Sequence, residues 1–316
     1  MSPFIGESCV SVTGTRHNWA LYIMAASCPT FDRRFMGDCT IRVASIKLRP
    51  YPFTRAARLK HGMEKEERTG IMATPMMVAR GRLAAEHRFF TGMAVAILVT
   101  VAVGFSRSFF LRPLFPDWHS PSESVFYVHG AAFTAWIVLL LAQASLVASG
   151  RTDLHRKVGP FGVVLAVSMV VLGTLGALIA ARRATGFVDI PVPPLQFLAV
   201  PLFDMVLFTL FVGLAIAMRR NAQGHKRCML LATINLTTAA IARWPGVLDF
   251  GPPAFFGLTD LFLVPLAIWD LRTRGRLHPV TLWGGLLFIV SQPLRLVVSG
   301  TESWLAFARW ATGLLG

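Results

Sequence analysis

The stretch from Phe126 to Arg156 reads FYVHGAAFTAWIVLLLAQASLVASGRTDLHR and decides the fold class. Its apolar part is about 20 residues long, enough for a helix with a rise of about 1.5 Å per residue to cross the hydrocarbon core of a bilayer. One ionisable side chain, His129, lies near its start, and a basic turn that contains His155 follows its end. The stretch therefore predicts a transmembrane helix that stops at a cationic interface.

The composition of the whole chain extends this interpretation to a bundle of such helices. Hydrophobic residues make up 54% of the 316 residues and charged residues only 15%, whereas a soluble domain has about 25% charged residues. The apolar runs do not show the period-two alternation of a transmembrane barrel. We therefore predict an all-α, polytopic transmembrane helical bundle in the inner (plasma) membrane.

Seven apolar runs are long enough to count as spans. A short tail, SWLAFARWATGLLG, follows the last of them and is typical of a segment that lies in the membrane interface. The predicted spans cover about residues 90–110, 124–149, 158–181, 195–218, 228–247, 253–270 and 279–299.

Basic residues are distributed unequally between the two sides that these spans define. Thirteen Lys and Arg residues flank the side on which the first span starts, and seven flank the other side. The positive-inside rule assigns the richer side to the cytoplasm, so the bundle starts inside and the C-terminus lies outside. The same rule explains the net charge of +15, and we expect membrane lipid, not nucleic acid, as the partner of these charges.

Residues 1–75 differ from the rest of the chain. They mix Pro, Arg, Ser and Cys and show no sustained helical or strand period. We predict that this region is irregular or disordered, or that it is not part of the native product. The second interpretation places the start of translation near Met72, Met76 or Met77 and gives a transmembrane domain over residues 76–316.

Several ionisable side chains fall inside the predicted spans, in the outer half of the membrane. Because an ionisable group near the centre of a span costs about 2.5–3.5 kcal/mol by insertion scales, such groups pair with one another or face water. One interpretation is an outward-facing cavity that binds or moves a small or lipidic ligand, with arginines that suit an anionic head group. The alternative is a structural network of ion pairs. The candidate residues are His129, Asp204, Arg243, Asp260, Gln292 and Arg295.

A second group of histidines lies at the cytoplasmic ends of the spans. His155 occurs in DLHRKVG and His225 in GHKRCML, each next to basic residues. One interpretation is that they bond to loop carbonyls or meet lipid phosphate. The other is that His155 and His225 are the axial ligands of a single b-type haem, which needs two histidines from different helices at one level. The protein is then a redox protein or a haem-related assembly factor.

Small residues recur at four-residue spacing in the third span, as Gly162 with Ala166 and Gly173 with Ala177. Such pairs let helix backbones approach closely in lipid, so they are candidate faces for a homo- or hetero-oligomer. The chain has no HExxH motif, Gly-rich phosphate loop or nucleophile elbow, and we expect a membrane protein that is not an enzyme.

Three motifs carry a family resemblance: HGAAFTAWIVLLLAQASLVASGRTDLHRKVG, HKRCMLLATINL and RGRLHPVTLWGG. Together they resemble a group of bacterial multi-pass membrane proteins without an assigned function, over roughly Arg88 to Trp310. Through the histidines at its helix ends the chain is also loosely similar to the four-helix membrane domains of b-type cytochromes. We assign no functional residues from that resemblance.

Overall fold

The computed structural model describes residues 9–15, 18–24, 43–47, 55–118, 123–188 and 190–315. The chain divides into two units, Met1–Met77 and Val78–Gly316. The second unit contains the predicted spans, and its described residues form helices and the loops that join them.

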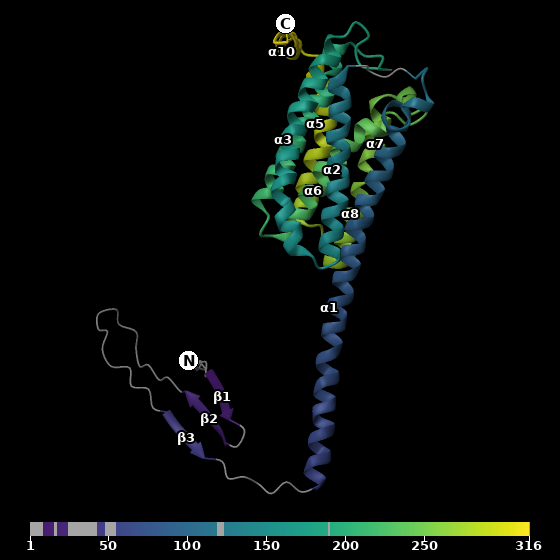
Figure 1. The fold of residues 1–316 in the computed structure, drawn as a ribbon. Helices are drawn as coiled ribbons and strands as arrows, with labels where there is room; N and C mark the ends of the chain where they lie inside the picture. Colours follow the sequence, from purple (N-terminus) through teal and green to yellow (C-terminus); the bar gives the residue numbers. More distant parts are fainter. Residues whose placement is uncertain are drawn as a thin grey trace, which may run out of the picture. The chain divides into compact units, whose positions relative to one another are not determined.

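The first unit contains three short strands. β1 (Cys9–Thr15), β2 (Asn18–Met24) and β3 (Val43–Lys47) form an antiparallel sheet in the order β1-β2-β3 (Figure 1). The sequence predicts an irregular region here and gives no clear sign of these strands. Their apolar alternation, such as Trp19, Leu21 and Ile23 in β2, lasts for only a few residues. The other residues before Arg55, to which the same prediction applies, lie outside the described residues.

Ten α-helices follow in the described part of the chain. They are joined by π-helical turns at Ser106–Phe110 (η1) and Val280–Gly284 (η4) and by 3-10 turns at Arg112–Leu114 (η2) and Leu248–Phe250 (η3). The α-helices are α1 (Arg55–Gly104), α2 (Ser124–Ala148), α3 (Thr152–Arg182), α4 (Pro194–Phe197), α5 (Ala199–Ala217), α6 (Ala222–Ile241), α7 (Pro252–Asp260), α8 (Leu263–Arg274), α9 (Gly285–Ser299) and α10 (Glu302–Gly313). Helix α1 thus begins inside the region that the sequence predicts to be irregular.

Six helical segments are long and apolar enough to cross a bilayer, so the protein is a multi-pass membrane protein. Three of the six are composite, because α4 continues into α5, α7 into α8 and η4 into α9. The segments are Arg80–Gly104, Ser124–Ala148, Thr152–Arg182, Pro194–Ala217, Pro252–Arg274 and Val280–Ser299.

Helix α6 overlaps the fifth predicted span, about 228–247, but is not among these six, because it is more polar. It lies at the centre of the bundle, where 14 of its 20 residues are buried. Trp136 of α2 donates a 3.2 Å hydrogen bond to Thr233, and Asn235 donates one of 2.8 Å to the carbonyl of Asp204 in α5. Because other helices surround α6, its polar side chains meet protein groups where an outer helix would meet lipid.

The sixth predicted span is broken at Leu261 and Phe262, between α7 and α8. Pro265 lacks the backbone N–H that would continue the helical hydrogen bonds to this point. The first span also ends earlier than predicted, at Gly104, and the chain then turns through η1 and η2. This early end carries Phe105, Arg107 and Phe109 back over the bundle.

The small residues of α3 pack within the bundle. A side chain at Gly173 would overlap the sulfur of Met205 in α5, and Ala166 and Ala177 are buried. A Cβ at Gly162 would lie 3.4 Å from Leu139 of α2. These residues therefore hold helices of one chain together, and an oligomer built on the same faces stays a prediction.

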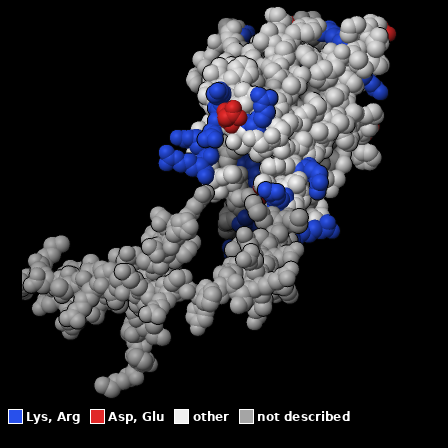
Figure 2. All heavy atoms as spheres, turned by 60° about the horizontal axis from the view of Figure 1, so that its bottom comes forward, with Lys and Arg blue, Asp and Glu red and all other residues white. Residues whose placement is uncertain are grey.

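The turns at residues 149–151, 218–221 and 275–279 lie at one end of the bundle, which we call the basic end. The opposite end holds the loops at 183–188 and 242–251 and the C-terminal helix α10 (Figure 1). Figure 2, which turns the basic end forward, shows Lys and Arg side chains gathered around it. The exposed basic residues there are Arg151, Arg156, Lys157, Arg219, Arg220, Arg272, Arg274 and Arg276.

Candidate ligand-binding site

A cavity of about 510 Å³ lies at the opposite end of the bundle. It is enclosed by η1, α2, α3, α5, α6 and the loops that follow α3 and α6. Its size falls within the range of about 300–1,000 Å³ that is usual for small-molecule sites. The cavity depends on the end of α1 at Gly104. Because the chain turns there into η1, the side chains of η1 cover this space and form part of the wall.

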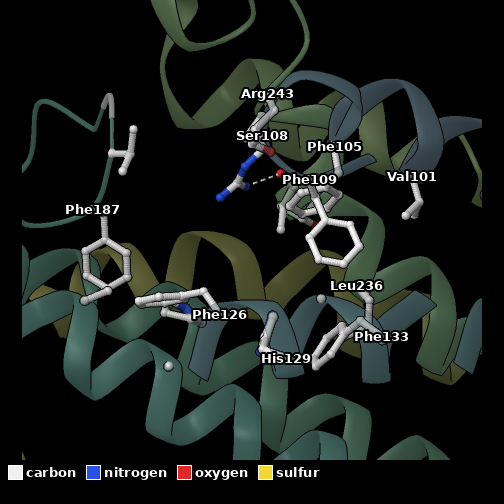
Figure 3. A pocket seen from close by; sticks show the side chains of 18 of the residues that line it. Val101, Phe105, Ser108, Phe109, Phe126, His129, Phe133, Phe187, Leu236 and Arg243 are labelled. Atoms are coloured by element: carbon white, nitrogen blue, oxygen red, sulfur yellow. Dashed lines mark hydrogen bonds between the residues drawn. The ribbon is translucent and has the colours of Figure 1, made fainter. Parts of the chain in front are cut away.

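Aromatic side chains form most of the cavity wall. Phe105 and Phe109 come from the segment after α1, Phe126 and Phe133 from α2, and Phe187 from the loop after α3 (Figure 3). Such a lining favours an apolar or aromatic ligand body, which leaves water on entering the cavity.

Four arginines, Arg107, Arg112, Arg183 and Arg243, also line the cavity. Each guanidinium lies over an aromatic ring. Arg107 is 5.0 Å from the ring centre of Trp118, Arg112 is 5.2 Å from Tyr127, Arg183 is 5.0 Å from Phe126 and Arg243 is 4.6 Å from Phe105. A ring face attracts a cation without using up its N–H groups, so this arrangement holds positive charge beside an apolar space.

Arg183 has spare hydrogen-bonding capacity. Its Nη1 lies 3.8 Å from Glu123 Oε2, longer than a hydrogen bond. Its Nε is buried and has no hydrogen-bond partner within the described residues. A buried donor without a partner costs about 1–3 kcal/mol, and an acidic ligand would remove that cost.

His129, the ionisable residue of the decisive stretch, also borders the cavity. Its ring stacks on Phe133 with centroids 4.1 Å apart, and the backbone of Leu172 is also its neighbour. The Nδ1 atom is buried without a hydrogen-bond partner in the described part of the chain. In Figure 3 the guanidinium of Arg243 points into the space that Phe126 and His129 border.

The cavity contains three of the six residues that the sequence proposes for it. His129, Asp204 and Arg243 line it, whereas Asp260, Gln292 and Arg295 are not part of its wall. Gln292 of α9 donates a 2.7 Å hydrogen bond to Asp260 of α7, away from the cavity. The six residues therefore separate into three that line the cavity, the Gln292–Asp260 pair, and Arg295, which is the partner of Asp204.

The structure also contains an ion pair of the kind that the sequence analysis gives as the alternative to a ligand cavity. Arg295 Nη1 donates a 2.5 Å hydrogen bond to Asp204 Oδ1. Arg295 Nη2 also donates to Ser291 Oγ at 3.1 Å, and its guanidinium lies 5.2 Å from the ring of Phe256. Arg295 is therefore the ion-pair partner of Asp204, the acidic residue that this part of the cavity wall contains.

The basic end contains a buried polar network that is not among the predicted sites. Arg227 of α6 and Asp270 of α8 are completely buried and form an ion pair. Asp270 Oδ2 also accepts hydrogen bonds from the backbone N–H of His278, at 3.0 Å, and from Thr281 Oγ1, at 2.6 Å. The carboxylate therefore has three partners, as a buried charge requires.

The same network continues to α1. Arg227 Nη1 donates to Gln223 Oε1 at 2.7 Å, and Gln223 Nε2 donates to Glu86 Oε1 at 3.1 Å. Lys226 forms an ion pair with Glu86. The sequence gives one sign of this network. Asp270 is an acidic residue at the end of an apolar span, and basic residues lie at the starts of other helices on the same side. The positive-inside rule already accounts for those bases, so the signal does not by itself indicate an ion pair.

His155 and His225, the haem candidates, are neighbours at the basic end. Their ring centroids are 6.2 Å apart and their planes are nearly perpendicular, at 86°. The Nδ1 atom of His225 lies 2.9 Å from the carbonyl oxygen of Ala215. Because a carbonyl only accepts, Nδ1 carries the proton and Nε2 has a free lone pair for a metal.

Sequence reasoning also missed Arg107, Arg112 and Arg183 as cavity residues. Their position at the ends of spans is compatible with a role in a cavity, but it is equally typical of arginines whose side chains extend to the membrane interface.

Comparison with family models, curated proteins and solved structures gives no match for this chain.

Proposed function

We propose that this protein binds an amphiphilic anion, with an acidic head group and an apolar body, in the cavity at the opposite end. The observation that carries the proposal is the set of four arginines on aromatic faces around one cavity. Guanidinium groups bind carboxylate and phosphate through two parallel hydrogen bonds, and the aromatic wall suits the apolar body.

The charges around the cavity support an anion over a cation. Four arginines line it, against the carboxylates of Asp204 and Asp249. Arg295 neutralises Asp204, so the wall keeps an excess of positive charge. In an environment with little water that excess is worth more than at an exposed surface.

We also propose that the protein crosses the membrane seven times, with the opposite end outside. Helix α6, with 20 residues, is long enough to be the seventh span. Chain direction then alternates, and the turns at 149–151, 218–221 and 275–279 fall on one side. The exposed Lys and Arg residues at that end indicate the cytoplasm. The cavity then lies in the outer leaflet, where it accepts ligand from the lipid or from the outer aqueous phase.

The proposal is tested with two probes that differ only in the head group, hexadecanoate and hexadecanol. Equilibrium binding of each radiolabelled probe is measured on the full chain in lipid nanodiscs, with empty nanodiscs subtracted. We expect hexadecanoate to bind at least about ten-fold more tightly, because a charge-assisted hydrogen bond is worth about 1.5–3 kcal/mol and ten-fold is about 1.4 kcal/mol.

Two variants connect the binding to the cavity. Arg183→Gln and Arg243→Gln each remove one guanidinium from the wall, and we expect each to weaken hexadecanoate binding about ten-fold while hexadecanol binding is unchanged. Arg309→Gln, an exposed arginine of α10 at the same end, is the matched control and keeps wild-type affinity. Equal affinity for both probes, or equal loss in all three variants, contradicts the proposal.

A further inference from the structure

We propose a second site at the other end of the bundle: His155 and His225 bind one copper(I) ion between their rings. His155 lies in the first turn of α3 and His225 in the first turn of α6. The two helices bring the rings together at a centroid separation of 6.2 Å. This site is independent of the arginine-lined cavity.

The separation of the rings fits an ion held by two nitrogens in a line. A metal–nitrogen bond of about 2 Å on each side, with about 1.1 Å from each nitrogen to its ring centre, places the centroids about 6.2 Å apart. A linear arrangement sets no condition on the twist between the rings, so perpendicular planes are compatible with it. The observed centroid separation of 6.2 Å is thus compatible with one ion between the two rings.

Each ring has a nitrogen available for the ion. His225 uses Nδ1 as a donor to the carbonyl of Ala215 at 2.9 Å, which fixes the tautomer and leaves Nε2 free. The Nδ1 of His155 is buried and makes no hydrogen bond of normal geometry within the described residues, with the backbone of Gln143 beside the ring. A hydrogen bond from Gln143 to the carbonyl of His155, at 3.2 Å, fixes the start of α3 beside it.

The number of ligands favours copper(I). Within the described part of the chain, a third His, Cys, Asp or Glu does not join the pair to form a three-ligand group. Zinc takes four ligands and magnesium six, whereas copper(I), with a filled d shell, is stable with two nitrogens. The sulfur of Met218 packs against Gly224, next to His225 in the chain, and thioethers are ligands that copper(I) accepts.

The charge of the surroundings favours the same ion. Arg156 follows His155 in the sequence, and Lys226 follows His225. They repel a divalent ion twice as strongly as a monovalent one. A single ion also needs only the gap between the rings, whereas a haem needs a slot for its macrocycle.

The experiment supplies copper(I) itself to the purified full chain, anaerobically with ascorbate, in competition with bicinchoninate. We expect one ion per chain, and at least about ten-fold weaker binding in His155→Asn and in His225→Asn. His87→Asn, another histidine at the basic end, is the matched control and keeps wild-type binding. X-ray absorption of the loaded wild type should show two nitrogen neighbours at about 1.9–2.0 Å.

A second measurement needs no variant that could misfold. Diethyl pyrocarbonate modifies free histidines, and mass spectrometry of the wild type locates the modified residues. Copper(I) should protect His155 and His225 and leave His87 reactive. Absence of stoichiometric binding, equal protection of all histidines, or an absorption band of haem that disappears in His155→Asn and His225→Asn overturns the proposal.

Discussion

Arg295 of α9 and Asp204 of α5 form a buried ion pair, with a 2.5 Å hydrogen bond from Nη1 to Oδ1. Only 1% of the Arg295 side chain and 11% of the Asp204 side chain are exposed. The pair joins two helices that are separated by most of the C-terminal half of the chain. It also removes one carboxylate from the charge balance of the neighbouring cavity.

The first prediction concerns the energy of this pair. Arg295→Leu leaves the carboxylate of Asp204 buried without its partner, and we expect the free energy of unfolding to fall by about 3–5 kcal/mol. SDS titration of the protein in mixed micelles, followed by circular dichroism, measures the change. Arg309→Leu, on exposed α10, is the control and changes stability little.

The double variant Asp204→Leu with Arg295→Leu separates an ion pair from simple loss of packing. Two apolar side chains leave no buried charge, so we expect much of the stability to return. If the double variant is as unstable as the two single losses added together, the charges are not coupled and the prediction is wrong.

The second prediction concerns the network at the basic end. Asp270→Asn keeps the shape of the side chain but removes the charge that balances completely buried Arg227. We expect a loss of about 3–5 kcal/mol in the same unfolding experiment. Asp153→Asn, an exposed acid in the first turn of α3, is the matched control. Equal stability of the two variants would show that the Asp270 charge has no structural role.

The third prediction concerns the contact between α1 and α6. A Cβ placed on Gly104 would overlap the backbone of Ala240, at 2.7 Å from its Cα. We expect Gly104→Ala to push the helices apart and to lower stability by about 1–3 kcal/mol. Gly92→Ala, where the added carbon has no neighbour within 4 Å, is neutral or raises stability by up to about 1 kcal/mol. Thermal unfolding of both variants in one detergent gives the comparison, and equal behaviour contradicts it.

The sequence predicts the spans well because each outer helix must present about 20 apolar residues to lipid. Helix α6 shows why apolarity alone is not a sufficient measure of a span. Its polar residues, such as Arg227 and Asn235, are covered by other helices, and their partners Asp270 and Asp204 lie far away in the chain. A one-dimensional pattern contains no information about such pairings.

The cavity shows a second reason why the sequence does not predict the whole site. Its wall depends on the turn that follows Gly104, which carries Phe105 and Arg107 back over α2 and α6. The apolar run continues past this point, and therefore the sequence predicts a longer span to residue 110. Depth in the membrane was enough to group His129 with Arg243, but the rotation of each helix decides which side chains share a space. That rotation places Asp260 and Gln292 elsewhere.

The last prediction concerns pH and His278, which lies in the turn between α8 and η4 and is only 7% exposed. Burial lowers the pKa of His278 below its ordinary value of 6.5, and the charges of Arg227, Arg274 and Lys226 lower it further, against the opposite effect of Asp270. In addition, its Nδ1 accepts a 3.1 Å hydrogen bond from the N–H of Val280, which requires the neutral ring.

A folded-state pKa below the unfolded value means that the unfolded chain binds the proton more readily. Stability is therefore complete above about pH 6.5 and falls as the pH is lowered below that value. We expect the unfolding temperature to decrease over this range in the wild type. His278→Asn keeps an acceptor for Val280 but does not titrate there, so its unfolding temperature should change less with pH. A parallel decrease in both proteins assigns the pH dependence to other groups and contradicts the prediction, whereas a smaller slope in the variant alone identifies His278 as the group that titrates.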